Sequence, residues 1–106
     1  MAQSIHDYDA RLANVLRKLE RSRISEENKK VIERFKDECF SNGLSKGRVV
    51  KYIYYLILLS EWIGNDFVKA QKEDIKALVS KIESSSYVEY SKKELKICIR
   101  KLYRWL

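Results

Sequence analysis

The sequence predicts a compact all-α bundle of about five helices in a single domain, residues 1–106. The chain has no proline and only three glycines, whereas β-sandwiches and barrels need many turn residues. Hydrophobic residues make up 45% and charged residues 35%, which fits one modest core under a charged surface. Apolar residues recur at helical spacing in five segments, and the short connections between them favour neighbouring, roughly antiparallel or crossed helices.

The first two helices are expected over residues 5–20 and 26–42. Ser4 precedes the first helix, and Ser25 precedes the second, where each side chain is expected to cap the free backbone N–H groups. Gly43 follows the second helix and supplies the left-handed conformation that ends many helices. The core faces are expected to consist of Ile5, Tyr8, Leu12, Val15, Leu16 and Leu19 in the first helix, and Val31, Ile32, Phe35 and Cys39 in the second.

The third segment, SKGRVVKYIYYLILLSEWI over residues 45–63, predicts the central helix, capped by Ser45 and ended by Gly64. It is apolar on nearly every side, which is typical of a helix enclosed by others. Its first two turns differ, because basic residues and tyrosines recur there at spacings of three and four and so share one face. These residues are Arg48, Lys51, Tyr52 and Tyr55.

The last two helices are expected over residues 71–83 and 87–106, with Phe67 and Val68 in the preceding loop packed against the core. Ser86 and Glu89 have the spacing of a capping box for the final helix. The core face of that helix is expected to contain Val88, Leu95, Cys98, Ile99, Leu102 and Leu106. Its opposite face carries the cationic stripe Lys93, Lys96, Arg100 and Arg104.

Positive charge is concentrated in the second part of the chain. The formal net charge is +7, of which residues 1–43 contribute +1 and residues 44–106 contribute +6. A basic region of this kind favours nucleic acid or an anionic membrane surface as a partner, although it also serves solubility. No apolar run is long enough to span a bilayer and no signal peptide begins the sequence, so we expect a cytoplasmic protein without a membrane partner.

The sequence contains no set of residues with the spacing of a catalytic site. Cys39 and Cys98 lack metal-ligand spacing and are expected to be reduced core thiols rather than a disulfide. His6 is the only histidine and has no second ligand nearby, and the sequence contains no glycine-rich phosphate loop. We therefore expect no catalytic residue, metal or cofactor in this chain.

Two basic helix surfaces are the candidate binding site. Helix N-termini favour phosphate, lysine and arginine neutralise it, and tyrosine and serine donate hydrogen bonds to phosphates or base edges. The alternative is that Tyr52 and Tyr55 are core aromatics and the cations a solvated face. The predicted DNA-binding residues are Lys46, Arg48, Lys51 and Tyr52 on the central helix, and Tyr90, Ser91, Lys92, Lys93, Lys96 and Arg100 on the final helix.

Four segments resemble the N-terminal, core-binding (SAM-like) domain of the tyrosine recombinases, the phage-integrase family, and they follow one another along the chain as in that family. GLSKGRVVKYIYYLILLSEWIG resembles that domain's basic, tyrosine-bearing and then leucine-rich helix. AQKEDIKALVSKI resembles its T-x-x-D-I helix, with Ala70 where threonine is common, and SKKELKICIRKLYRWL resembles its closing helix. Upstream, ISEENKKVIERFKDEC resembles an extra helix of archaeal integrase-like members.

The resemblance implies a DNA clamp. This domain would cover one face of a recombination half-site in double-stranded DNA. A catalytic domain beyond Leu106 would carry the family's Arg, His-x-x-Arg and nucleophilic Tyr, and none of these is assigned here, Tyr103 included. The isolated domain would be a monomer and the full protein an oligomer on DNA. Two alternatives are a helical protein-interaction module that docks through Trp62 or Trp105, and a free-standing DNA-binding regulator.

Overall fold

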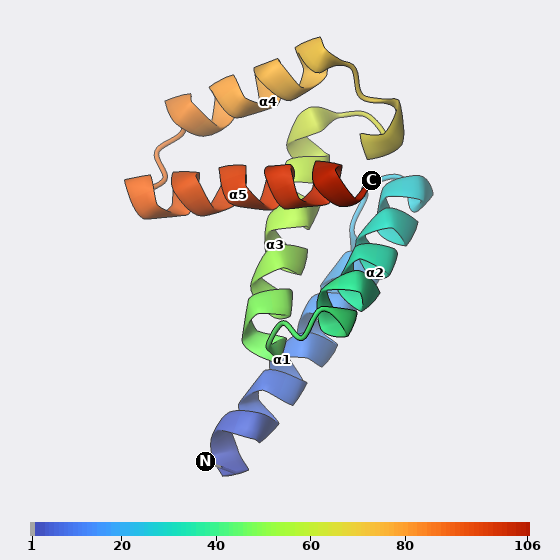
Figure 1. The fold of residues 1–106 in the computed structure, drawn as a ribbon, viewed down its shortest axis with the longest axis vertical. Coiled ribbons are helices and arrows are strands. Elements are labelled where there is room, and N and C mark those ends of the chain that lie inside the picture. Colours follow the sequence, from blue (N-terminus) through green and yellow to red (C-terminus); the bar gives the residue numbers. More distant parts are fainter. Residues whose placement is uncertain (1) are drawn as a thin grey trace.

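The structure, a computed structural model, describes residues 2–106, with side chains from Asp7 onward. Within that range the chain is all α-helical apart from one 3-10 turn, and no strand occurs, which confirms the predicted fold class (Figure 1). The first helix begins at Ala2 and not at residue 5, so Ser4 lies within the helix and is not the residue that precedes it. The core position expected of Ile5 and the position of His6 lie outside the described side chains. The elements are α1 (Ala2–Arg21), α2 (Glu26–Ser41), α3 (Lys46–Ile63), η1 (Phe67–Lys69), α4 (Lys72–Ser84) and α5 (Glu89–Trp105).

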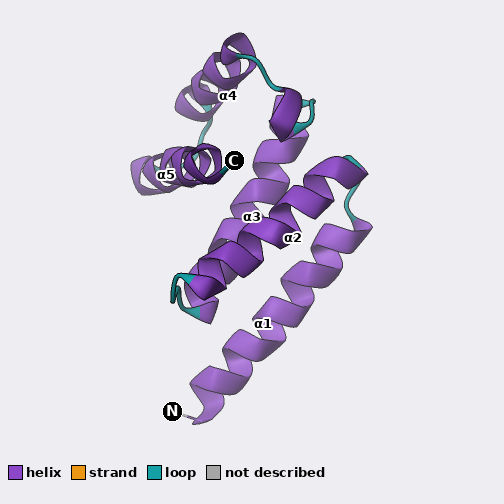
Figure 2. Ribbon diagram, turned by 45° about the vertical axis from the view of Figure 1, so that its right-hand side comes forward, coloured by secondary structure: helices purple, strands orange, loops and turns teal. Residues whose placement is uncertain are grey.

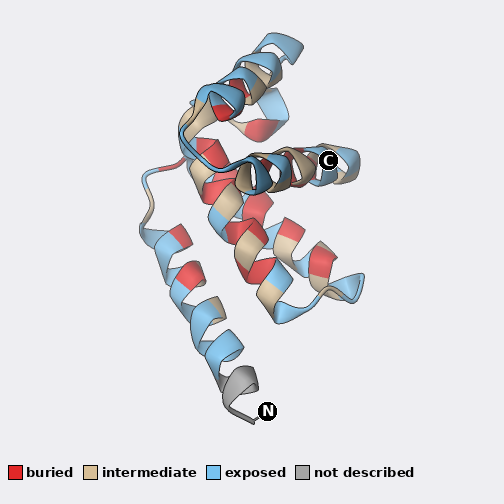
Figure 3. Ribbon diagram, turned by 90° about the vertical axis from the view of Figure 1, so that its left-hand side faces the viewer, coloured by how far each residue is buried: buried red, intermediate tan, exposed pale blue. Residues whose placement is uncertain are grey.

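α3 is the centre of the bundle, and it contacts each of the other four helices. α1 and α2 run beside α3, while α4 and α5 pack at its other side, with α5 lying across it (Figures 1 and 2). Buried residues follow α3 and the helix faces turned toward it (Figure 3). The leucine-rich part of α3 is therefore the scaffold on which the other helices assemble.

The ends of the first helices follow the local signals in the sequence. The Ser25 hydroxyl accepts a hydrogen bond from the Asn28 backbone N–H at 3.1 Å, and the Ser45 hydroxyl accepts one from Arg48 N–H at 3.3 Å. Gly43 and Gly64 follow α2 and α3 with φ of +80° and +64°, a conformation that L side chains rarely adopt. The predicted caps and stops of α2 and α3 are thus confirmed.

The start of α5 is a correction. The helix begins at Glu89 with Val88 as its N-cap residue, so neither the expected start at residue 87 nor the Ser86 capping box forms. The reason is that the Ser85 hydroxyl donates to the Ile82 carbonyl at 2.7 Å and accepts from the Tyr87 N–H at 3.4 Å, which extends the turn after α4. Val88 consequently stands outside the core.

Four apolar residues expected in the core are exposed instead, whereas Phe67, one of the two expected to pack from the loop, is buried. Phe67 is held by α5, because the Tyr103 hydroxyl donates to its carbonyl at 3.0 Å and the two rings meet edge to face. Burial raises the pKa of Tyr103 to about 12, so its hydroxyl remains a neutral donor at neutral pH. The exposed residues are Tyr8, Val68, Val88 and Leu106.

A buried amide locks α2, α3 and η1 together. The Asn28 side chain donates to the Ser60 hydroxyl at 2.6 Å and to the Asn65 carbonyl at 3.0 Å, and it accepts from the Phe67 N–H at 2.8 Å. Among the described side chains no buried polar atom lacks a partner. This network, the Asn28 lock, fixes the C-terminal end of α3 against α2.

Both cysteines are buried and free, as predicted. The Cys98 thiol lies 3.9 Å from the Tyr52 carbonyl oxygen, and burial raises the pKa of both thiols. None of the helices within residues 2–106 has the length and apolarity needed to cross a bilayer.

Candidate nucleic-acid interface

The first half of α3 meets the first half of α5, so the two predicted basic surfaces adjoin. Lys51 Nζ lies 2.6 Å from Glu94 Oε1 and 3.3 Å from the Tyr90 hydroxyl, and it sits 5.2 Å from the centre of the Tyr90 ring. We call this surface the α3–α5 corner. It consists of Arg48, Lys51, Tyr90, Glu94 and Lys101.

Electrostatics keep the corner charged. The hydrogen bond from Lys51 holds the pKa of Glu94 below its ordinary value, and the same bond raises the pKa of Lys51. A hydrogen bond with the Tyr52 hydroxyl raises the pKa of Arg48, whose guanidinium is exposed. Arg48 is therefore a permanent cation, placed by the first turn of α3, and it has no carboxylate partner of its own among the described residues.

Tyr52 is a correction to the predicted site. Its side chain is only 3% exposed, its ring lies 6.4 Å from that of Phe35, and the Lys101 ammonium sits 6.0 Å above it. Tyr52 is thus a core aromatic whose hydroxyl supports Arg48, and it does not present a face to a partner. The core alternative for this residue is the right one, because α5 crosses over it.

Glu94 and Lys101 belong to the corner but were absent from the predicted set. They are separated by seven residues, and Tyr90 precedes Glu94 by four, so all three share one face of α5. That spacing was available in the sequence. Glu94 is acidic, and the predicted cationic stripe lies on the neighbouring face of α5, so neither residue belongs to the predicted basic surfaces.

Lys46 and Ser91 lie away from the corner. Lys46 forms an ion pair with Asp9 of α1. Ser91 is half-buried in a hollow that Tyr54 and Tyr87 also line. Neither residue is part of the outer surface of α5.

Lys92 and Lys96 face α4. Lys92 Nζ donates to the Glu83 carbonyl at 2.8 Å, which satisfies a backbone group in the last turn of α4, and the lysine side chain is only 12% exposed. Lys96 Nζ lies 2.6 Å from Glu83 Oε1, and this hydrogen bond lowers the pKa of Glu83. These two lysines hold α4 against α5, so their charge is largely committed within the domain.

Lys93 and Arg100 remain as exposed cations on the outer edge of α5, and Arg104 continues the row. None of the three has an ion-pair partner among residues 7–106. Arg100 and Arg104 also border a groove of about 670 Å³ between α4 and α5, whose other cations are Lys72 and Lys76. The outer edge of α5 therefore extends the positive charge of the corner.

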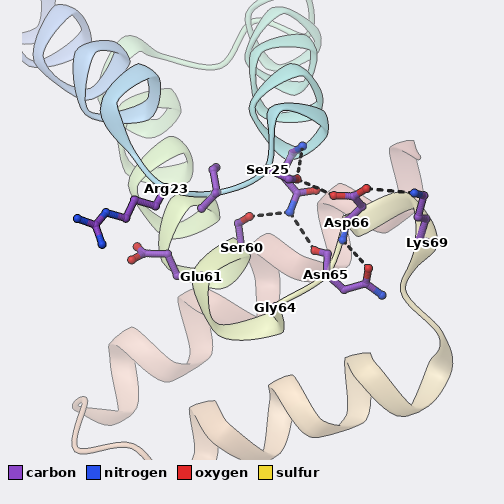
Figure 4. A pocket seen from close by; sticks show the side chains of 10 residues that line it. Arg23, Ser25, Ser60, Glu61, Gly64, Asn65, Asp66 and Lys69 are labelled. Atoms are coloured by element: carbon purple, nitrogen blue, oxygen red, sulfur yellow. Dashed lines mark hydrogen bonds and ion pairs between the residues drawn. The ribbon is translucent and has the colours of Figure 1, made fainter.

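The polar hollow beside the Asn28 lock is a different kind of site. It encloses about 530 Å³, and Figure 4 shows several of its side chains bonded to one another, with Ser25 donating to Asp66 at 2.6 Å and Lys69 paired with Asp66. The bonded groups of this hollow have their partners within the domain and stabilise the fold. In the described part of the chain no group of three or more His, Cys, Asp or Glu side chains is placed to hold a metal.

Comparisons with protein-family models, curated proteins and solved structures find no match to this chain.

Proposed function

We propose that this domain binds double-stranded DNA through the α3–α5 corner and the outer edge of α5. The observation that carries the proposal is the meeting of the two basic helix surfaces at Lys51 and Tyr90, from segments 39 residues apart. In the sequence these surfaces are separate. In the fold they form one face with cations on both helices.

The chemistry of this face suits a phosphate backbone. Arg48, Lys93 and Arg100 are exposed cations, and neutralising phosphates with such side chains releases counterions from DNA. Glu94 is the acid at the corner, and Lys51 neutralises it. Tyr90, at 65% exposure, adds a hydroxyl that reaches phosphate or a base edge. A helix such as α5 fits the major groove.

We further propose that the domain is the N-terminal clamp of a site-specific tyrosine recombinase. The support is the order and spacing of the four segments that resemble the core-binding domain of that family. Under this proposal a catalytic domain would act from the other face of the half-site. A reading frame that continues past Leu106 and encodes Arg, His-x-x-Arg and Tyr would support the recombinase, and a stop codon would favour a free-standing regulator.

The interaction-module alternative rested on exposed tryptophans, and both pack within the domain. Trp62 lies against Tyr87 with ring centres 6.0 Å apart, under the Lys81 ammonium. Trp105 lies against Phe35 at 5.6 Å. No observation on these residues favours a protein partner over DNA.

The test reverses charge on the outer edge of α5. In Lys93→Glu/Arg100→Glu we expect duplex affinity to fall more than tenfold at about 100 mM salt, because two phosphate contacts are lost. The slope of log affinity against log salt should shrink by about 1.8, at about 0.9 for each contact. Fluorescence anisotropy with a mixed-sequence duplex measures both quantities, and circular dichroism verifies the helical fold.

The matched control is Arg17→Glu/Arg21→Glu, which makes the same change in net charge on exposed positions of α1. We expect this variant to retain most of the duplex affinity. Equal losses in the two double variants would show a general charge effect, and unchanged affinity in a folded Lys93→Glu/Arg100→Glu protein would contradict the site.

A further inference from the structure

Exposed tyrosines gather on one side of the molecule. Four of the seven tyrosines are among the exposed large side chains, at 41% for Tyr8, 42% for Tyr54, 43% for Tyr87 and 65% for Tyr90. They come from α1, α3, the loop before α5 and α5 itself. Duplex binding at the α3–α5 corner uses only Tyr90, so it does not account for the exposure of Tyr8, Tyr54 and Tyr87.

These tyrosines border two adjoining hollows along α3, which together we call the tyrosine groove. The first hollow, of about 750 Å³, is lined by Tyr8 of α1 and by Gly47 and Tyr54 of α3. The second, of about 250 Å³, is lined by Tyr54 and by Tyr87. Tyr54 and its neighbour Tyr55 line both hollows, so the two hollows adjoin. From residue 47 to residue 58 the groove follows α3 for about 16 Å.

Cations accompany the aromatic rings of this tyrosine groove. The Arg11 guanidinium lies 5.6 Å from the centre of the Tyr8 ring, and the Lys18 ammonium lies 5.7 Å from that of Tyr54. Arg48 and Lys51 line the end of the groove nearest the corner. The second hollow also has one acid, Glu61, at its far end. The groove is thus basic along most of its length, with aromatic faces between the charges.

The groove is built on helix packing. At Gly47 an added Cβ would lie 2.9 Å from the Tyr8 ring, so the missing side chain lets α1 approach α3 there. Tyr54 projects from α3, the most extensively packed helix of the domain. Aromatic rings held by such elements lose little conformational freedom when a flat ligand stacks on them.

We propose that the tyrosine groove binds single-stranded nucleic acid, with unpaired bases stacking on Tyr54 and Tyr87 and with Arg11, Lys18 and Arg48 contacting the phosphates. Alternating aromatic faces and cations along a groove match single strands, because every base has a face that can stack. Paired bases are already stacked within a duplex and cannot use these rings. The proposal stands independently of duplex binding, with which it shares Arg48 and Lys51.

The experiment compares leucine with phenylalanine at the two stacking positions. Tyr54→Leu and Tyr87→Leu keep apolar bulk but remove the aromatic face, whereas Tyr54→Phe and Tyr87→Phe keep it. With a fluorescent oligodeoxythymidylate of about 12 nucleotides, we expect each leucine variant to bind about fivefold more weakly and each phenylalanine variant to stay within about twofold of wild type. In NMR spectra, stacking should also move the Tyr54 ring protons upfield.

An abasic phosphodiester of the same length and charge tests the role of the bases, and we expect it to bind at least tenfold more weakly than oligodeoxythymidylate. Equal binding of the two probes would overturn the proposal, because phosphate attraction alone would then account for affinity. Unchanged affinity in folded leucine variants would overturn it as well. Equal losses in the leucine and phenylalanine variants would do so too, since the hydroxyls would then be responsible.

Failure of this proposal is distinguishable from failure of duplex binding. Lys93→Glu/Arg100→Glu changes residues outside the groove, so it should weaken the duplex and leave oligodeoxythymidylate binding within about twofold. Tyr54→Leu should do the reverse. If both variants weaken both probes by the same factor, the separate single-strand site is wrong.

Discussion

The two ends of α3 carry polar clusters of opposite character. At the C-terminal end, Asn28 and Ser60 are neutral, buried and bonded to each other and to backbone groups. At the N-terminal end, Lys51 and Glu94 are charged and reach solvent, with side-chain exposures of 34% and 16%. One cluster joins helices permanently, and the other is open to an outside partner.

Solvent access explains the difference. A buried hydrogen-bonding group whose partner is removed keeps its full desolvation penalty, so the Asn28 lock is expensive to break. A partly exposed ion pair is screened by water and contributes little to stability. The same exposure leaves the cations of the corner free to exchange partners. Loss of the first cluster should therefore affect folding, and alteration of the second should affect binding.

The largest expected effect comes from Asn28→Ala. Removal of the amide leaves the Ser60 hydroxyl, the Asn65 carbonyl and the Phe67 N–H without their partner. We expect the free energy of unfolding to drop by about 3 kcal/mol, with a fall in Tm of about 15 °C. Urea and thermal denaturation followed by circular dichroism measure these changes.

Asn14→Ala is the matched control, because Asn14 is exposed on α1. It should lower stability by less than about 0.5 kcal/mol. At a temperature where the Asn28→Ala protein is still folded, the duplex affinity of Asn28→Ala should equal that of wild type. A stable Asn28→Ala protein with impaired duplex binding would reverse the contrast between the two ends of α3.

A smaller effect is expected from Glu94→Gln, which should strengthen duplex binding, whereas Asn28→Ala should weaken the fold. The substitution removes the acid of the corner and releases Lys51 for phosphate. Duplex affinity should rise about threefold to tenfold, and the salt slope should steepen by about 0.9. The free energy of unfolding should change by less than about 1 kcal/mol.

Glu27→Gln on α2 makes the same charge change in another exposed ion pair, with Lys30. Its duplex affinity should rise less than twofold in the same anisotropy titration. If the two variants gain equally, the corner has no special part in binding.

The smallest effect concerns pH. Lys51 holds the pKa of Glu94 below its ordinary value of 4.5, so the pair favours the folded state above that pH. The contribution is lost as pH falls through the lowered pKa of Glu94, because the protonated carboxyl no longer attracts Lys51. Carboxyl ¹³C NMR should show the pKa of Glu94 returning toward 4.5 in Lys51→Met.

Lys96→Met provides the internal control for that titration. It should raise the lowered pKa of Glu83 and leave that of Glu94 unchanged, because Lys96 pairs with Glu83. A shift in the pKa of Glu94 in the Lys96→Met variant would mean that α4 and the α3–α5 corner are electrostatically coupled.

Helix ends and core periodicity were predictable because they depend on neighbours in the chain. Ser25, Ser45 and Gly64 act within four residues of their own positions, and all three were assigned correctly. The start of α5 was missed for a related reason. The Ser85 hydroxyl bonds to the last turn of α4. This extended turn takes the place of the capping box expected from Ser86, and α5 begins after Val88.

The candidate site was predictable in composition but not in geometry. The order of residues shows that Lys92, Lys93 and Lys96 share one helix. It does not show that Lys92 and Lys96 bind Glu83 of α4. Burial of Tyr52 likewise depends on where α5 crosses α3. The tyrosine groove joins residues of three helices and a loop, so no single segment predicts it.

Local chemistry in the chain was therefore sufficient for the all-α fold, the central place of α3 and a basic second half. Backbone capping and apolar periodicity act over one or two turns, which is the range over which a sequence can be interpreted directly. The partners of each charge, the meeting of Lys51 with Tyr90 and the adjoining hollows of the tyrosine groove arise from helix packing. They depend on contacts between distant segments, whose geometry is set when the whole core closes.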